Sequence, residues 1–251
     1  MTELLPTTIQ SLKSADPDRY RSALMADQQG RLDLLTLYSF HYELAKVPDV
    51  TSEPMMGEIR YQWWRDAIEE IYSGKAVRRH EVATPLSELI SRRKLSRFHV
   101  DQLIDGRARD LDPTPFENLD EAKAYCRQTS GVLMQLGIAC LGADGSEPVD
   151  AGEAWGMTGL ARAYGFYHDR ILSELDIETL LASAEGSYEA TKAGMQRIGP
   201  NTMPAIAYIG LIPGFLKRMR SSGFDPQTQR VNYGPIAKQF KLFRIGLTGR
   251  L

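Results

Sequence analysis

Apolar residues recur every three or four positions along nearly the whole chain, which is the spacing of amphipathic helices. One apolar stripe runs from Leu34 through His41 to Leu44, and another runs from Ile59 to Ile71. No segment alternates between apolar and polar residues in the manner of a half-buried strand. The pattern therefore predicts an all-α protein.

Start and stop signals place the predicted helices. Ser52, followed by Glu53 and Pro54, predicts the N-cap of a helix that ends before Gly74. We expect a single domain over residues 1–251, with residues 1–19 as a candidate flexible segment. Further helices are expected within residues 84–94, 96–111, 118–141, 151–175, 177–197, 203–219 and 235–248.

Composition narrows the class of protein. The 251 residues are 43% hydrophobic and carry a net charge of −2, which is typical of neither a nucleic-acid-binding nor a disordered chain. The first 20 residues contain no unbroken apolar stretch of a secretory signal, and the longest apolar run, 203–216, is shorter than the ~20 residues of a spanning helix. We expect a cytoplasmic protein, with peripheral attachment to the inner face of the membrane as an open alternative.

The two cysteines, Cys126 and Cys140, fall within one predicted helix. At a rise of about 1.5 Å per residue they lie roughly 21 Å apart, which is too far for a disulfide bond. We expect both to be small buried side chains in a reducing compartment.

Basic residues gather at the C-terminal end. From Lys217 onward there are eight Lys and Arg residues and a single acid, Asp225. The predicted last helix has an apolar stripe of Ile236, Phe240, Phe243 and Leu247, beside the basic residues Lys238, Lys241 and Arg244. Two interpretations remain open. Either the aromatic stripe docks on the core and the cations are solvated, or the cations also contact an anionic membrane surface or an acidic partner.

No general catalytic or metal-binding motif occurs. The four histidines lack the H-E-x-x-H spacing, and there is no G-x-S-x-G sequence. Two carboxylate pairs, Asp66 with Glu70 and Asp101 with Asp105, lie one helical turn apart. Such pairs bind magnesium diphosphate only when they face one another across a cavity, so we expect solvated surfaces at both.

Five segments, in order, resemble the squalene/phytoene synthase family. They are "WWRDAIEEI" (63–71), "HEVATPL" (80–86), "LIDGRARDL" (103–111), "YCRQTSGVL" (125–133) and "AWGMTGLAR" (154–162). The resemblance extends over residues 20–251 and implies an isoprenoid-synthase helical bundle around a central, largely apolar cavity.

Enzymes of that family hold magnesium ions with two aspartate-rich motifs on facing helices, and the ions bind the diphosphate of a prenyl donor. In this sequence Phe40-His41-Tyr42 stands where the family has F-C-R. The aspartate positions that follow are Ala45, Lys46 and Asp49, and those of the second motif are Ala163 and Tyr167, next to Arg162. The resemblance therefore implies that the metal site is lost and that no cofactor is bound.

Residues 40–68, "FHYELAKVPDVTSEPMMGEIRYQWWRDAI", resemble a branch of the family that serves the assembly of respiratory NADH dehydrogenase (complex I). The resemblance implies a non-catalytic assembly factor that contacts complex I subunits, or a lipid-handling protein with an apolar ligand. Two alternatives stay open: an active, magnesium-dependent transferase that joins two prenyl diphosphates, and a lipid-binding module of the membrane surface. The candidate binding residues of the cavity are Phe40, Glu43, Lys46, Tyr125, Arg162 and Tyr167. The chain departs from the branch around residues 166–180.

Overall fold

The computed structural model describes residues 4–143, 149–167, 171–194, 200–231 and 233–251. Within these ranges the protein is all-α and contains no strand, which confirms the prediction made from apolar spacing. The helices are α1 (Pro6–Ala15), α2 (Pro17–Ala23), α3 (Gln28–Ala45), α4 (Val47–Val50), α5 (Pro54–Tyr72), α6 (Ala83–Arg93), α7 (Arg97–Ala108), η1 (Arg109–Leu111), α8 (Leu119–Cys126), η2 (Arg127–Gly131), α9 (Val132–Cys140), α10 (Val149–Arg162), α11 (Tyr164–Tyr167), α12 (Ile177–Gly194), η4 (Pro200–Ala205), η5 (Ala207–Leu211), α13 (Ile212–Met219) and α14 (Pro235–Thr248).

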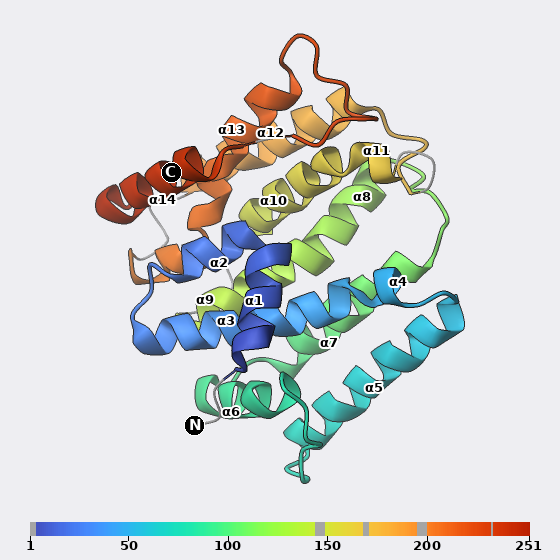
Figure 1. Cartoon of the computed structure of the whole chain (residues 1–251), viewed down its shortest axis with the longest axis vertical. Coiled ribbons are helices and arrows are strands. Elements are labelled where there is room, and N and C mark those ends of the chain that lie inside the picture. The colour runs from blue at the N-terminus through green and yellow to red at the C-terminus, as the bar shows by residue number, and fades with distance from the viewer. Residues whose placement is uncertain (1–3, 144–148, 168–170, 195–199, 232) are drawn as a thin grey trace.

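The central helices of the bundle are α3, α7, α9 and α10 (Figure 1). Helix α5 packs on α7 and forms one edge of the molecule, while α12 and α13 cover α10 on the other side. The last helix, α14, lies against η5 and α2 at the periphery, far from the N-terminal end of α5 (Figure 1). The molecule therefore has two outer helices at opposite ends.

Local sequence explains where several helices begin and end. The side chain of Asn118 accepts a hydrogen bond from the amide of Glu121 and caps α8. Gly74 adopts a φ of 69° just after α5, a conformation that glycine tolerates best. The predicted cap Ser52 is one residue early, because Glu53 occupies the N-cap position and its side chain makes no capping bond.

Two predicted helices are less regular than expected. The single helix expected over 118–141 is continuous but contains a π-helical segment, η2, between α8 and α9. The helix expected over 203–219 is α-helical only from Ile212, because Pro204 lies inside a preceding 3₁₀ segment and cannot donate a backbone hydrogen bond. At the N-terminus, residues 6–15 and 17–23 form α1 and α2, and Leu12 is buried in the core.

Helix α10 crosses the end of α8 and the π-helical segment η2 at very short range. A Cβ atom built on Gly152 would lie 2.2 Å from the Cα of Gly131, and one on Gly156 would lie 2.6 Å from the Cβ of Cys126. Glycine at both positions lets the two backbones approach, so α10 is held at a fixed distance from η2.

Cys126 and Cys140 are unbonded and buried, as the sequence predicts. Burial raises the pKa of both thiols well above the ordinary value. Among the described helices, none combines the length and the apolar character needed to span a bilayer.

Candidate functional site

A cleft of about 930 Å³ opens between α4 and the end of α10. Its walls include Asp49, Arg162 and Ala163, together with residues 226–231. The fold thus brings together both positions at which this chain retains a residue of the family's metal motifs. They come from segments more than 100 residues apart in the sequence.

Arg162 is held firmly at this cleft. Its guanidinium stacks on the ring of Phe215, with 4.1 Å from the central carbon to the ring centroid, and lies 3.7 Å from the carboxylate of Asp18. Burial lowers the pKa of Arg162, and the nearby Asp18 carboxylate opposes that effect. Because Asp18 already partly neutralises this cation, Arg162 is not a freely available counter-ion for a diphosphate.

Lys46 has a local partner of its own. It caps the C-terminal end of α3, and its ammonium lies 2.5 Å from a carboxylate oxygen of Glu43 one turn earlier. The same ammonium sits 5.4 Å from the centre of the Tyr42 ring. The positive charge of Lys46, which stands at an aspartate position of the family's motif, is therefore compensated by Glu43 on α3.

Glu43 also lines a second, smaller pocket of about 290 Å³. This pocket has aromatic walls, because the rings of Trp63, Trp64 and His80 lie within 5.3 Å of one another. Phe40 is fully buried behind them, with its ring 5.0 Å from that of Trp64. Phe40 therefore supports the pocket from the core and does not line it, and the binding of an apolar ligand stays a prediction.

Tyr125 belongs to a half-buried polar network that ends at the buried His41. Its hydroxyl donates to Asp110 at 2.6 Å and accepts from Arg107 at 2.9 Å. Arg107 also donates to the Nε2 atom of His41 at 2.8 Å, so this nitrogen must be unprotonated. Burial, and then the charge of Arg107, hold the pKa of His41 well below its ordinary value.

Sequence reasoning missed Arg107 and Asp110, although both lie in the quoted segment 103–111. It also missed Arg19, which is buried on α2 with its guanidinium 2.7 Å from Asp16 and 5.0 Å from the Tyr208 ring centroid. An arginine that ends up inside a bundle carries no local signal. Its burial depends on partners that the fold supplies.

Tyr167, the remaining candidate, is the last residue of α11, and its side chain lies outside the described part of the structure. The predicted departure from the branch at 166–180 includes residues 168–170, which also lie outside it.

Helix α14 is oriented opposite to the docked arrangement expected from its sequence. Leu242 and Ile245 face the core, whereas Ile236, Phe240, Phe243 and Leu247 are 84%, 71%, 60% and 72% exposed. Lys238, predicted as a surface cation, is only 8% exposed, and its ammonium bonds to both carboxylate oxygens of Asp18 at 2.8 and 3.0 Å. The predicted surface role of Lys238 is therefore wrong, because the interior acid Asp18 captures it.

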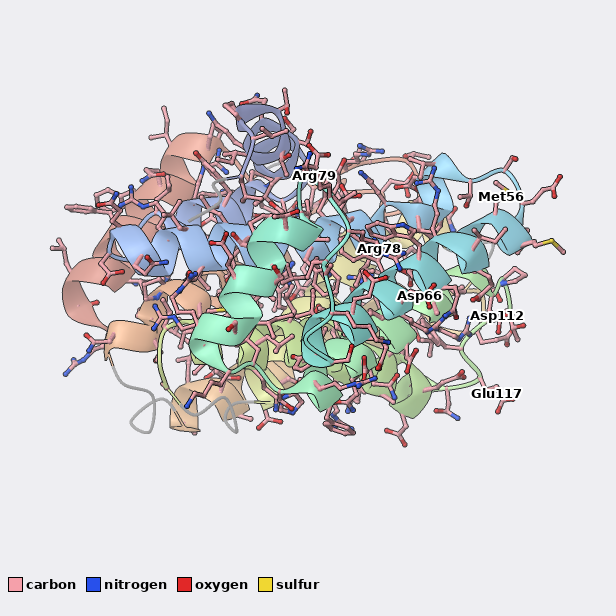
Figure 2. All side chains as sticks on the ribbon, turned by 90° about the horizontal axis from the view of Figure 1, so that it is seen from below. Met56, Asp66, Arg78, Arg79, Asp112 and Glu117 are labelled. Carbon is pink, nitrogen blue, oxygen red and sulfur yellow. The ribbon has the colours of Figure 1, made fainter. Side chains whose placement is uncertain are left out.

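The N-terminal end of α5 presents a second exposed apolar surface. Met55, Met56 and Ile59 are exposed, whereas Gly57 between them packs against the side chain of Leu111. Figure 2 shows Met56 at the outer edge of the molecule, away from the body of the bundle. We call Met55, Met56 and Ile59 the methionine surface.

The carboxylate pairs are engaged by basic or amide side chains at the surface. Glu70 pairs with Arg78, Asp105 with Arg65, and Asp101 with Arg97, while Asp66 accepts from Gln62. Asp66 and Arg78 lie on the outer side of α5 and on the segment after it (Figure 2). In the described part of the chain, no group of three or more His, Cys, Asp or Glu side chains is placed to hold a metal ion.

A sequence model of the family described as squalene/phytoene synthase matches residues 12–172, which is more than half of the chain. The chain belongs to the squalene/phytoene synthase family. Solved structures of similar fold include a dehydrosqualene synthase with bound ligand, at a TM-score of 0.78 and 16% identity, covering 95% of this chain and 94% of that one. Another is a squalene synthase from Alicyclobacillus acidocaldarius, at a TM-score of 0.67 and 14% identity, covering 84% of this chain and 91% of that one. The bundle is thus the isoprenoid-synthase fold, as the resemblance implied.

Several curated relatives of the chain carry the name NADH dehydrogenase (ubiquinone) complex I, assembly factor 6. The human protein is 28% identical over 134 residues, which cover 53% of this chain and 40% of the human one. The mouse protein is 26% identical over 166 residues, which cover 64% of this chain and 50% of the mouse one. The matched stretches thus span only 40–50% of these two relatives.

The magnesium cluster of the family's enzymes does not fit the described residues of the cleft. Magnesium prefers several oxygen ligands, and Asp49 is the single carboxylate among the described residues that line the cleft. The nearby acid Asp18 is buried and already bonded to Lys238. We therefore derive no metal-dependent step for this squalene/phytoene synthase family member.

Proposed function

We propose that this protein is a non-catalytic member of its family that assists the assembly of respiratory NADH dehydrogenase (complex I). The names of the curated relatives support the proposal. The observation that carries it is the position of residues 52–60, which belong to the segment resembling the assembly branch. All of them are exposed except Gly57.

This exposure matters because buried residues can be shared among relatives for packing alone. Met55, Met56 and Ile59 contribute little to the core, so packing does not explain an apolar sequence here. Methionine adapts its shape easily and is frequent at protein-binding surfaces. The charged neighbours Glu58 and Arg60 are also exposed, and a polar rim around apolar contacts is typical of a protein interface. We propose the methionine surface as the contact for a complex I subunit.

The non-catalytic part of the proposal rests on the cleft. Ionisation of a prenyl diphosphate needs its developing negative charge to be stabilised, and divalent ions supply that in the family's enzymes. Here Lys46 is paired with Glu43, and Arg162 lies close to Asp18. Purified protein given farnesyl or geranylgeranyl diphosphate with magnesium should release diphosphate far more slowly than ~1 per second. Release at that rate or faster would contradict this part.

The assembly function is tested in the native host. Deletion of the gene should lower the amount of assembled complex I, measured by native gel electrophoresis and by NADH oxidation in isolated membranes. Wild-type protein and Phe98→Ser, which alters an exposed phenylalanine on α7, should restore it. The Met55→Ser, Ile59→Ser double variant should not, at equal abundance and equal thermal stability. Undiminished complex I after deletion would refute the assembly function, whereas full rescue by the double variant would refute only the methionine surface as the contact.

A further inference from the structure

The outer face of α14 has no described partner, although it carries the most exposed large apolar side chains of the helix. Ile236, Phe240, Phe243 and Leu247 are spaced by four, three and four residues, so they form one continuous stripe about 16 Å long at 1.5 Å per residue. At about 100° per residue, this stripe lies nearly opposite the face formed by Lys238, Leu242 and Ile245. We call it the outer stripe.

The orientation is fixed by the contacts of the inner face. Leu242 and Ile245 are buried, and Lys238 reaches Asp18 on α2. A rotation of α14 that buried the phenylalanines would pull the ammonium of Lys238 away from Asp18 and leave that acid in the interior without its bonded partner. The outer stripe therefore stays at the surface, where apolar patches of this kind mark contacts with other molecules.

The charges beside the outer stripe are positive. Arg244 and Lys241 lie on one flank of it, and α14 contains no acid. No described acidic side chain pairs with either residue, and the pKa of Lys241 is lowered by burial, by Arg244 and by Lys192 on α12. This flank therefore carries positive charge that no described acid neutralises, and this charge is available to an anionic surface.

We propose that α14 docks this protein on an anionic membrane surface, with the outer stripe among the lipid chains and with Lys241 and Arg244 at the headgroups. An amphipathic helix of this kind lies in the plane of the interface with its apolar face about 5–10 Å deep. Basic residues near the surface add attraction that falls as salt is raised. A second copy of the chain is a poorer occupant, because two outer stripes packed together would bring their cationic flanks close to each other.

The position of α14 suits this role. It lies at the periphery of the bundle, and its outer side is covered by no other described helix (Figure 1). The methionine surface lies at the other end of the molecule. A protein docked through α14 would therefore leave the methionine surface free for a subunit, although the membrane proposal does not depend on that function.

Vesicle flotation tests the proposal with vesicles of phosphatidylcholine alone and of phosphatidylcholine with phosphatidylglycerol in equal parts. Wild-type protein should float with the mixed vesicles and much less with the neutral ones, and the bound fraction should fall as salt is raised. Phe240→Ser with Phe243→Ser should weaken binding about tenfold or more. Phe98→Ser, a matched exposed phenylalanine elsewhere, should bind as wild type does.

The charge contribution is tested separately. Lys241→Gln with Arg244→Gln should weaken binding to mixed vesicles and flatten the salt dependence, whereas Lys75→Gln should change neither. The depth at which the outer stripe enters the lipid is tested with Phe240→Trp. Lipids brominated on their chains should quench the fluorescence of the added tryptophan, whereas they should not quench that of Phe98→Trp. All variants replace exposed or half-buried side chains, so unchanged circular dichroism and thermal midpoints are expected and are checked first.

Three results would overturn the proposal. The first is wild-type protein that stays unbound with mixed vesicles at low salt. The second is a Phe240→Ser, Phe243→Ser variant that floats as wild type does. The third is a wild-type protein that sediments as a dimer and does not bind vesicles, together with a Phe240→Ser, Phe243→Ser variant that sediments as a monomer and does not bind them either. The outer stripe would then be the contact with a second copy of the chain.

Discussion

The buried pair of Lys238 and Asp18 joins the last helix to the second one, 220 positions apart in the chain. We predict that Lys238→Ala destabilises the protein through this contact. The substitution removes an ammonium bonded to both carboxylate oxygens at 2.8 and 3.0 Å and leaves Asp18 almost completely buried. The remaining cations, Arg21 and Arg162, are each 3.7 Å away, beyond good hydrogen-bond distance.

The magnitude follows from these distances. Removing one partner of a buried pair costs about 3–5 kcal/mol when the other charge is left uncompensated. Arg21 and Arg162 retain part of the compensation, so we expect a loss of about 2–4 kcal/mol in the free energy of unfolding. Lys241→Ala, on the same helix without a described acidic partner, should change it by less than about 0.5 kcal/mol.

Urea unfolding followed by circular dichroism measures the loss, and hydrogen exchange of the α14 amides shows whether the helix detaches before the rest unfolds. A double-mutant cycle with Asp18→Asn isolates the pair, for which we expect a coupling of about 1–3 kcal/mol. The reasoning is refuted if Lys238→Ala and Lys241→Ala are indistinguishable in both measurements.

Two further predictions concern the core. Gly152→Ala should lower the free energy of unfolding in urea by about 2 kcal/mol or more, because the new Cβ would lie 2.2 Å from the backbone of Gly131. Gly137→Ala should be tolerated, because its Cβ would meet its neighbours at 3.4 Å or more. Equal stability of the two variants would contradict this prediction. The buried His41 stays neutral beside Arg107 in the folded protein, whereas the unfolded chain takes up a proton near pH 6.5, so stability should fall as the pH is lowered. The expected loss from this residue is about 1.4 kcal/mol between about pH 7.5 and about pH 5.5. His41→Gln should remove that part of the slope, and an unchanged slope would refute the assignment.

The sequence alone was enough to predict an all-α protein, because apolar spacing is a local property of the chain. The squalene/phytoene synthase family was implied by the resemblance of five segments in the same order. The sequence also placed the bounds of α14 correctly and indicated that Cys126 and Cys140 are buried without a disulfide bond. Its picture of the candidate site was less complete. It selected Arg162 and Tyr125, but it missed Arg107, Asp110 and the buried Arg19, because their contacts with Tyr125, His41 and Tyr208 form only in the folded chain.

Helix α14 shows why the tertiary structure was needed. Periodicity identifies which residues of a helix share a face, but it does not say which face turns inward. The apolar stripe with two phenylalanines looked like the docking face, and Lys238 looked like a solvated cation. In the fold the phenylalanines are exposed and Lys238 is buried. Lys238 pairs with the buried acid Asp18 on α2, and this pair fixes the rotation of α14 about its axis. The same holds for the cleft, because Asp49 and Arg162 line one cleft only after α4 and α10 are packed into one bundle.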